Sequence, residues 1–521
     1  MAEQSIPLSV YLLRSDRVGS FEAALSVGTA ALPLVPTLDG YAIGLPSAPR
    51  TPEWVPVVQS VLQSPVGFSM VGQSAAAFLV VRQGGKTFVL TFGYAWAKLD
   101  DDWLEPDFGR RIALNLIPPD QLVEIHVEQI FAKWHVARER APRASSVQEF
   151  GVQFDRDLVA SVEGVPSNSQ FGKKIRGATS LRVEVPFSQL TDLLKESITY
   201  FESDSYKKNW PEIDNMKVVT DEALVVQLEN QFDGELKSGQ AQNKMVMFTP
   251  AYRKADVWTV DSYVYGRMTK TPATTPYLLV DGWLNYLAKT NREPSVEIAK
   301  ESLIHLMDEG KEALDRCSAF QCFGYELSFA GRQYILSSGI WYEVAIDFLN
   351  KVNKTASKIP PPKIALPAWN GVETEGEFNL RCGQVDGFYS FDAKNIVFGG
   401  GQSKFEFCDI FYPKSKTLYF AKVPSKSSGM SHLVEQVRRT TELLFSADGA
   451  YRKELTKVFQ KYHKGANTDW LKTRPKHGEW NLCLVSLGKP ALKLPFFARC
   501  GLAKVYTDLR EQGHDVSFLT V

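Results

Sequence analysis

Cysteines are few in this sequence and long apolar runs are lacking, which excludes several classes of protein. Among its 521 residues there are six cysteines, and no pair has the Cys-x-x-Cys spacing of zinc ribbons or dithiol redox sites. No uninterrupted apolar run reaches the about 18 residues of a membrane-spanning helix. The amino terminus also lacks the basic and apolar regions of a signal peptide. We therefore expect a cytoplasmic protein with reduced thiols, no structural zinc and no membrane partner.

Net charge is also lacking. The chain carries 59 Lys and Arg against 59 Asp and Glu, so the whole molecule has no field that would attract nucleic acid or an anionic membrane. Hydrophobic residues make up 44% and charged residues 23%, which is ordinary for a folded chain with a large core. At about 150 residues per domain, this length predicts roughly two to four domains.

Helix and strand signals alternate along the chain and suggest three mixed α/β domains, at 1–150, 151–310 and 311–521. In the first, residues 120–140 have a more helical pattern, and residues 107–117 resemble a tight turn next to a sheet. The sequence "DFG" at 107–109 occurs in kinases, but no glycine-rich loop or other kinase motif accompanies it. In the second, His305 lies in an apolar helical pattern without a metal-ligand partner, which indicates a structural histidine.

The third region has the clearest pattern. A hairpin is predicted at 321–339 and a helix at 340–358, and a proline-rich stretch then ends that helix. The elements expected after it are strands at 387–392, 395–399, 404–412 and 417–423, a helix at 431–446, a strand at 479–488, a helix at 495–513 and a strand at 514–521. This order predicts a mixed sheet flanked by helices rather than an all-β sandwich.

Two charged residues stand out within the apolar strands of this region. Asp409 follows "FEFC" and Lys422 follows "TLYFA", and alternation would place each on the same face as the apolar residues two positions away. Because an unpaired buried charge costs several kcal/mol, such residues are usually paired or functional. One interpretation is therefore a structural Asp–Lys pair, and the other is a site.

The element order and these two residues resemble the core of restriction endonucleases. In that core an Asp on one strand and a [DE]xK sequence on the next converge on a metal ion. Asp409 and Lys422 match the first and last places of the pattern, whereas Phe420 stands in the acidic place. The resemblance implies that Asp409 holds Mg²⁺ and that Lys422 positions the attacking water or the phosphate.

A second carboxylate would then have to come from another element. Glu343 or Asp347, in the predicted helix 340–358, could supply it, and so could Glu435 in the predicted helix 431–446. Glu343 is the one that we place in the predicted catalytic set with Asp409 and Lys422. Glu406 is disfavoured, because its odd spacing from Asp409 would send it to the opposite face of a regular strand.

Residues 401–480 are basic, with fifteen Lys and Arg against eight Asp and Glu. Aromatic residues lie among these cations, at Phe459, Tyr462, Trp470 and Trp480, a combination that can hold a phosphate backbone and stack bases. Serines after Lys422 could bind phosphate at a helix amino terminus or could simply cap that helix, and the cations could equally form a solvated face. The predicted nucleic-acid-binding residues are Lys426, Ser427, Ser428, His432, Arg438, Arg439, Lys461 and Lys464.

Several motifs along almost the whole chain resemble a sporadically distributed bacterial family of unknown function. They are "TFGYAW", "DFGRRIALNLI", "FGKKIRGATSLRV", "SYKKNWPEIDN", "GIWYEV" and "FEFCDIF…LYFAKVPSKSSGMSHLVEQ". Members of that family more often carry His where Phe420 stands. Their genes often lie near restriction-modification and mobile-element genes, which implies a role in defence against phage or foreign DNA.

These observations leave three functional hypotheses. The first is a nucleic-acid-acting defence protein, either a Mg²⁺-dependent nuclease or a degenerate relative of one, with DNA or RNA as its substrate. The second is a non-catalytic nucleic-acid-binding or assembly protein, working as a homo-oligomer or with another component of a defence system. The third is an enzyme acting on a small molecule between the first two domains, which no motif supports.

Overall fold

The computed structural model describes residues 5–25, 31–45, 75–129, 135–145, 150, 152, 157–250, 260–269, 272–308, 313–397, 404–424 and 427–521. The chain divides into two units, of which the first comprises Met1–Val127, Ala137–Val152 and Val159–Asp214. The second comprises Glu128–Val136, Gln153–Leu158 and Asn215–Val521. Both contain helices and sheets, which confirms the mixed α/β class, while the division into three domains stays a prediction. Within these ranges no helix is both long enough and apolar enough for a membrane span.

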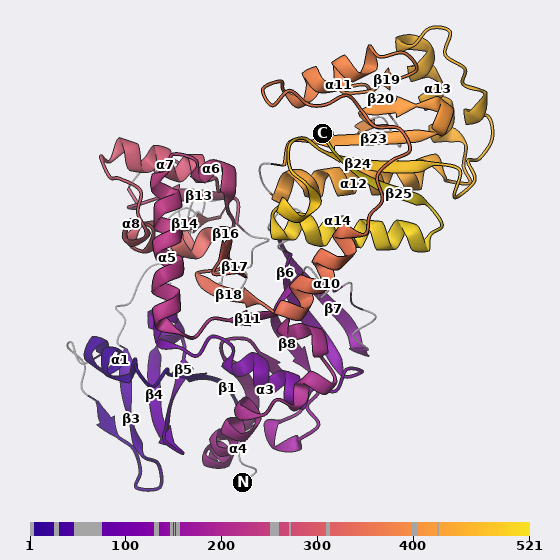
Figure 1. Cartoon of the computed structure of the whole chain (residues 1–521). Coiled ribbons are helices and arrows are strands. Elements are labelled where there is room, and N and C mark those ends of the chain that lie inside the picture. Colours follow the sequence, from indigo (N-terminus) through magenta and orange to yellow (C-terminus); the bar gives the residue numbers. More distant parts are fainter. Residues whose placement is uncertain are drawn as a thin grey trace, which may run out of the picture. The chain divides into compact units, whose positions relative to one another are not determined.

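The first unit is built on a ten-stranded sheet with the order β2-β3-β4-β5-β1-β10-β9-β8-β6-β7 (Figure 1). Its strands are β1 Ser5–Leu12, β2 Leu32–Pro33, β3 Gly40–Leu45, β4 Ala76–Gln83, β5 Lys86–Phe92, β6 Leu122–Gln129, β7 His135–Ser145, β8 Asp157–Gly164, β9 Ile175–Gly177 and β10 Leu181–Pro186. Its helices are α1 Val18–Leu25, α3 Phe108–Leu116 and α4 Leu190–Glu202. Helix α3 packs closely on the sheet, since a Cβ on Gly109 would lie 2.0 Å from the carbonyl oxygen of Ser180.

Two predictions for this unit are wrong. Residues 120–140, expected to be helical, contain β6 and the first part of β7, because Val123, Ile125 and Val127 alternate as β-branched residues in a strand do. Residues 107–117, expected to be a turn, contain helix α3, whose buried Phe108 and Ile112 are one helical turn apart.

The second unit begins with two small sheets. The order is β11-β18-β17-β16-β12 in one and β13-β14-β15 in the other. The strands are β11 Met216–Val218, β12 Met245–Met247, β13 Ser262–Tyr265, β14 Leu303–Met307, β15 Ala313–Ser318, β16 Phe323–Phe329, β17 Arg332–Ser337 and β18 Ile340–Val344. The helices are α5 Glu222–Lys237, α6 Ala241–Lys244, α7 Val280–Lys289, α8 Val296–Glu301 and α9 Ala319–Cys322.

The predicted hairpin at 321–339 is confirmed, because β16 and β17 pair in antiparallel fashion. His305 lies in strand β14 and not in a helix, with its ring buried as a structural histidine requires. The predicted helix 340–358 is wrong over its first residues, where "IWYEV" forms strand β18, and helix α10 Ile346–Ser357 begins only afterwards. Glu343 is therefore a strand residue.

The carboxyl-terminal sheet has the order β19-β22-β23-β24-β25. Strands β19 Tyr389–Ser390, β22 Ile410–Tyr412 and β23 Thr417–Lys422 are antiparallel neighbours, whereas β23, β24 Asn481–Ser486 and β25 Asp515–Thr520 run parallel. The helices of this part are α11 Glu375–Gly383, α12 Ser427–Leu444, α13 Ala450–Tyr462 and α14 Phe496–Glu511, and β20 Asn395–Val397 and β21 Lys404–Glu406 form a separate ribbon. The predicted mixed sheet with flanking helices is confirmed.

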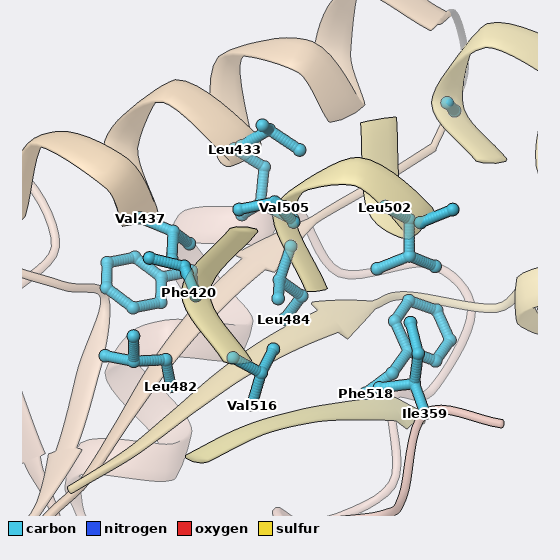
Figure 2. Close-up of a cluster of buried hydrophobic side chains, with 14 of the residues drawn as sticks. Ile359, Phe420, Leu433, Val437, Leu482, Leu484, Leu502, Val505, Val516 and Phe518 are labelled. Atoms are coloured by element: carbon cyan, nitrogen blue, oxygen red, sulfur yellow. The ribbon is translucent and has the colours of Figure 1, made fainter. Parts of the chain in front are cut away.

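Both faces of this sheet are buried, which explains why its strands are apolar at nearly every position. Phe420 of β23 points to the face covered by α12 and α14, where it lies with Leu433 and Val437 (Figure 2). Leu418 belongs to the same core cluster. Tyr419 and Ala421 point to the other face and pack in a second cluster with residues of α11. Lys422 is the last residue of the strand, so it stands where this apolar pattern ends.

Candidate functional site

Asp409 lies where the ladder between β22 and β23 ends. Residues 404–412 do not form the single strand that was predicted, because β21 belongs to another sheet and β22 begins only at Ile410. The carboxylate Oδ2 of Asp409 accepts a hydrogen bond of 2.6 Å from the N–H of Ala421 in β23. The main-chain N–H of Asp409 donates a hydrogen bond to the carbonyl of Tyr419, and the carbonyl of Asp409 accepts one from the N–H of Phe391. The side chain thus replaces a main-chain acceptor at the end of the ladder.

Burial sets the protonation of this carboxyl group. Only 4% of Asp409 is exposed, and loss of hydration raises its pKa to about 8 against an ordinary value of 3.8. The hydrogen bond from Ala421 opposes this rise, and the negative charges of Glu375, Glu406 and Asp392 add to it. At neutral pH the folded protein therefore favours the neutral acid at this position.

Lys422 pairs with a carboxylate that the sequence did not point to. Its Nζ lies 2.7 Å from Oε1 of Glu375, the first residue of α11, and both side chains keep about 30% of their surface exposed. The other oxygen of Glu375 accepts a hydrogen bond of 3.3 Å from the N–H of Val423. Glu375 thus binds both the side chain at the end of β23 and the main chain just beyond it.

The structure therefore brings three groups from three elements to one end of β23. Asp409 precedes β22, Lys422 ends β23 and Glu375 begins α11. Asp409 bonds to the main chain of β23 and Lys422 to Glu375, so the direct Asp–Lys pair is replaced by two separate interactions. The sequence signal near Glu375 is the capping box of α11, in which Thr374 and Glu377 bond reciprocally; it indicates the helix start but not the contact with Lys422.

The other carboxylates weighed from the sequence lie elsewhere. Glu343 forms an ion pair with Arg332 of the neighbouring strand β17. Asp347 is exposed in the first turn of α10, and Glu435 lies 3.7 Å from Arg438 on α12. Glu406, which strand alternation disfavoured, is one of the charges that act on Asp409, because the chain bends between the two residues.

A half-buried lysine, Lys394, follows β19, the strand that pairs with β22, and was also missed. Its amine donates a hydrogen bond to the carbonyl of Ser390 and lies 5.5 Å from the ring centroid of Tyr462. Burial lowers the pKa of Lys394, and the negative charge of Asp392 opposes that change. The sequence signal was the turn "FDAKN", which places an acid and a lysine beside a strand end.

The predicted nucleic-acid-binding residues lie in different surroundings. Lys426 and the side chains of Ser427, Ser428 and His432 lie outside the described residues. Arg438 is engaged by Asp508 of α14, 2.7 Å away, while Arg439 is exposed on α12. The residues that lie together on an exposed surface are Lys461 and Lys464, at the end of α13.

The aromatic residues proposed for base stacking are mostly inside the core. Phe459 and Trp480 are buried, and the half-buried Trp470 packs against both of them. Tyr462 is 46% exposed, and Lys461 stands 4.9 Å from the centroid of its ring. The aromatic–basic pattern thus mainly reflects buried rings and exposed cations of α13 and of the segment after it, and Tyr462 keeps the accessible ring that stacking needs.

Comparison with known proteins identifies the chain at the level of a family. No curated protein and no solved structure matches it. One family model covers nearly the whole chain, in agreement with the resemblance seen in its motifs. The chain belongs to the family of unknown function DUF6119, whose model matches residues 8–521.

Proposed function

We propose that this protein binds nucleic acid through a restriction-endonuclease-like carboxyl-terminal domain, as a degenerate relative of the metal-dependent nucleases. The order of elements in this part of the chain agrees with that core: helix α11, the antiparallel strands β19, β22 and β23, helix α12 and the parallel strand β24. Glu375, Asp409 and Lys422 gather at the strand end where such enzymes carry their site. The gene neighbourhood that the family resemblance implies supports a role for this binding in defence against phage or foreign DNA.

The residues at this strand end do not fit Mg²⁺, which takes oxygen ligands in near-octahedral geometry. Asp409 favours its neutral form, and Glu375 already bonds to Lys422 and to Val423. Phe420 offers no ligand and is completely buried. Within the described part of the chain, no three His, Cys, Asp or Glu side chains lie close enough to hold a metal ion.

The observation that carries the proposal is the exposed basic surface of α13 and the segment after it. Its cations are Lys453, Lys457, Lys461, Lys464, Lys472, Arg474 and Lys476, and only two acidic residues, Glu454 and Asp469, lie between the first and last of them. Those acids pair with Lys457 and Lys472. The remaining positive charge, together with the exposed ring of Tyr462, suits a phosphate backbone and an unpaired base.

The double variant Lys461→Gln/Lys464→Gln is expected to bind nucleic acid about tenfold more weakly than the wild type near 100 mM salt, because two cations that would neutralise phosphates are removed. The salt dependence of binding should also become shallower by about 1.4 in the log–log slope for a single strand. Fluorescence anisotropy with labelled single- and double-stranded DNA and RNA measures both quantities.

The matched control removes two exposed lysines from the first unit, in Lys195→Gln/Lys208→Gln. This variant should bind as the wild type does, since its charge change is the same but its location differs. A binding surface on α13 would be contradicted if both double variants bound nucleic acid equally weakly, or if the affinity of the wild type did not depend on salt concentration.

Metal-dependent cleavage is a second candidate function, which the order of the elements favours although Glu375, Asp409 and Lys422 do not fit a metal ion. It predicts that Lys422→Ala and Glu375→Gln each abolish cleavage of DNA or RNA in Mg²⁺ or Mn²⁺, while Lys195→Gln/Lys208→Gln does not. Gel analysis of end-labelled substrates makes the measurement. Binding without cleavage supports the degenerate relative, and cleavage that depends on both residues supports the nuclease.

A further inference from the structure

Cys317 and Cys322 bring two thiols into contact in the second unit. Cys317 lies in β15 and Cys322 is the last residue of α9, with one helical turn between them. Ser318 caps that turn and forms a capping box with Gln321, which fixes the reversal of the chain. The Sγ atoms of the two cysteines are 3.2 Å apart, and both residues are buried.

This distance favours a bond between the sulfurs over a shared metal ion. Two thiolates on a tetrahedral zinc ion, each about 2.3 Å from the metal, are about 3.8 Å apart, so these thiols would have to separate. A metal would also need further ligands, and no such group of side chains exists among the described residues. A disulfide of about 2.05 Å requires the sulfurs to approach, which small side-chain rotations can supply.

We propose that Cys317 and Cys322 form a redox-modification site, in which a hydroperoxide converts the two thiols into an intramolecular disulfide. One thiolate attacks the peroxide oxygen, which gives a sulfenic acid and one molecule of water when the oxidant is hydrogen peroxide. The second thiol then attacks the sulfenic sulfur and releases another water. The two cysteines lose two electrons and two protons, and the peroxide is reduced to two waters.

The cross-link would make the connection between two sheets more rigid. Cys317 is in the three-stranded sheet, and Cys322 directly precedes Phe323, where β16 of the five-stranded sheet begins. Both belong to one core cluster with Phe320 and Trp283. Because the bond closes a short loop of the unfolded chain, oxidation is expected to raise the melting temperature by about 2–4 °C.

Peptide mapping tests this site directly, because trypsin cleaves after Arg316 and Arg332 and leaves both cysteines in one peptide. The full chain is treated with hydrogen peroxide, in buffer and at a urea concentration just below unfolding, then denatured and alkylated. We expect this peptide to be two hydrogen atoms lighter and unalkylated, and to regain both alkylation sites after reduction with dithiothreitol.

Two variants separate the pair from the other thiols. In Cys317→Ala, Cys322 should remain open to alkylation or pass to higher oxides, and the rise in melting temperature should disappear. Cys382→Ala removes a buried cysteine of α11 and should leave the light peptide unchanged. Full alkylation of both cysteines in the wild type, under oxidation that converts a small dithiol in the same tube, would overturn the proposal.

Discussion

Asp409→Asn is expected to stabilise the folded protein at pH 8 and to stabilise it much less at pH 5. The carboxyl group is 4% exposed and has a pKa of about 8 in the folded chain, against 3.8 ordinarily. An Asn can still accept the hydrogen bond from the N–H of Ala421, and it carries no charge to bury. Each pKa unit corresponds to about 1.4 kcal/mol, so with some entry of water the difference should reach about 2–5 kcal/mol.

The sign follows from proton binding. Because its pKa is raised on folding, the folded state holds a proton at Asp409 that the unfolded state releases above about pH 4. The stability contributed by this group is therefore complete below pH 4, declines as the pH rises and levels off above about pH 8. The Asn variant should lack this decline.

Urea unfolding from pH 5 to pH 9 measures the effect as the difference between the variant and the wild type, in which all other titrating groups cancel. Asp347→Asn is the control, because it removes an exposed carboxylate in the first turn of α10 that does not act on Asp409. If the Asn variant instead loses stability as the pH rises, Asp409 is ionised in the folded protein, as a metal ligand would have to be.

The carboxyl-terminal elements were predictable from the sequence because their environment is uniform. Strands β23, β24 and β25 are covered on both faces, so they appear as short apolar runs between helices with a regular apolar face. The single strand predicted at 404–412 is wrong for the opposite reason, because its environment changes within the segment. Phe405, Phe407, Asp409 and Phe411 alternate without interruption, so the sequence pattern does not reveal the bend between the two observed strands. The helix predicted at 120–140 is wrong because the alternating β-branched residues Val123, Ile125 and Val127 favour a strand.

The site was predictable only in part. Asp409 and Lys422 were found because charge is rare inside apolar strands, and their convergence on one strand end follows from the antiparallel order of β22 and β23. Glu375 could not be found in this way, since its contact with Lys422 depends on how α11 packs across the sheet. A local sequence pattern indicates where a helix starts and which face of a strand is buried. It does not indicate which side chains come into contact through tertiary packing.

Restoring the acid of the nuclease pattern, in Phe420→Glu, is expected to unfold the carboxyl-terminal part of the protein rather than to create a metal site. Phe420 is fully buried among Val437, Leu482 and other apolar residues of one core cluster (Figure 2). A carboxylate there would lose its hydration without a partner, and the packing of the aromatic ring would be removed as well. Together these two effects should cost about 4 kcal/mol or more.

Thermal unfolding with and without Mg²⁺ distinguishes packing from latent metal binding, with Phe420→Leu as the matched variant. The leucine keeps the position apolar and should cost only about 1–2 kcal/mol. A metal that binds the folded state alone must raise the melting temperature, so a gain with Mg²⁺ in Phe420→Glu but not in Phe420→Leu would reveal an open site beside Lys422. If Mg²⁺ changes the melting temperature of neither variant and the Glu variant is far less stable, Phe420 fills the acidic place of the nuclease pattern with a core residue.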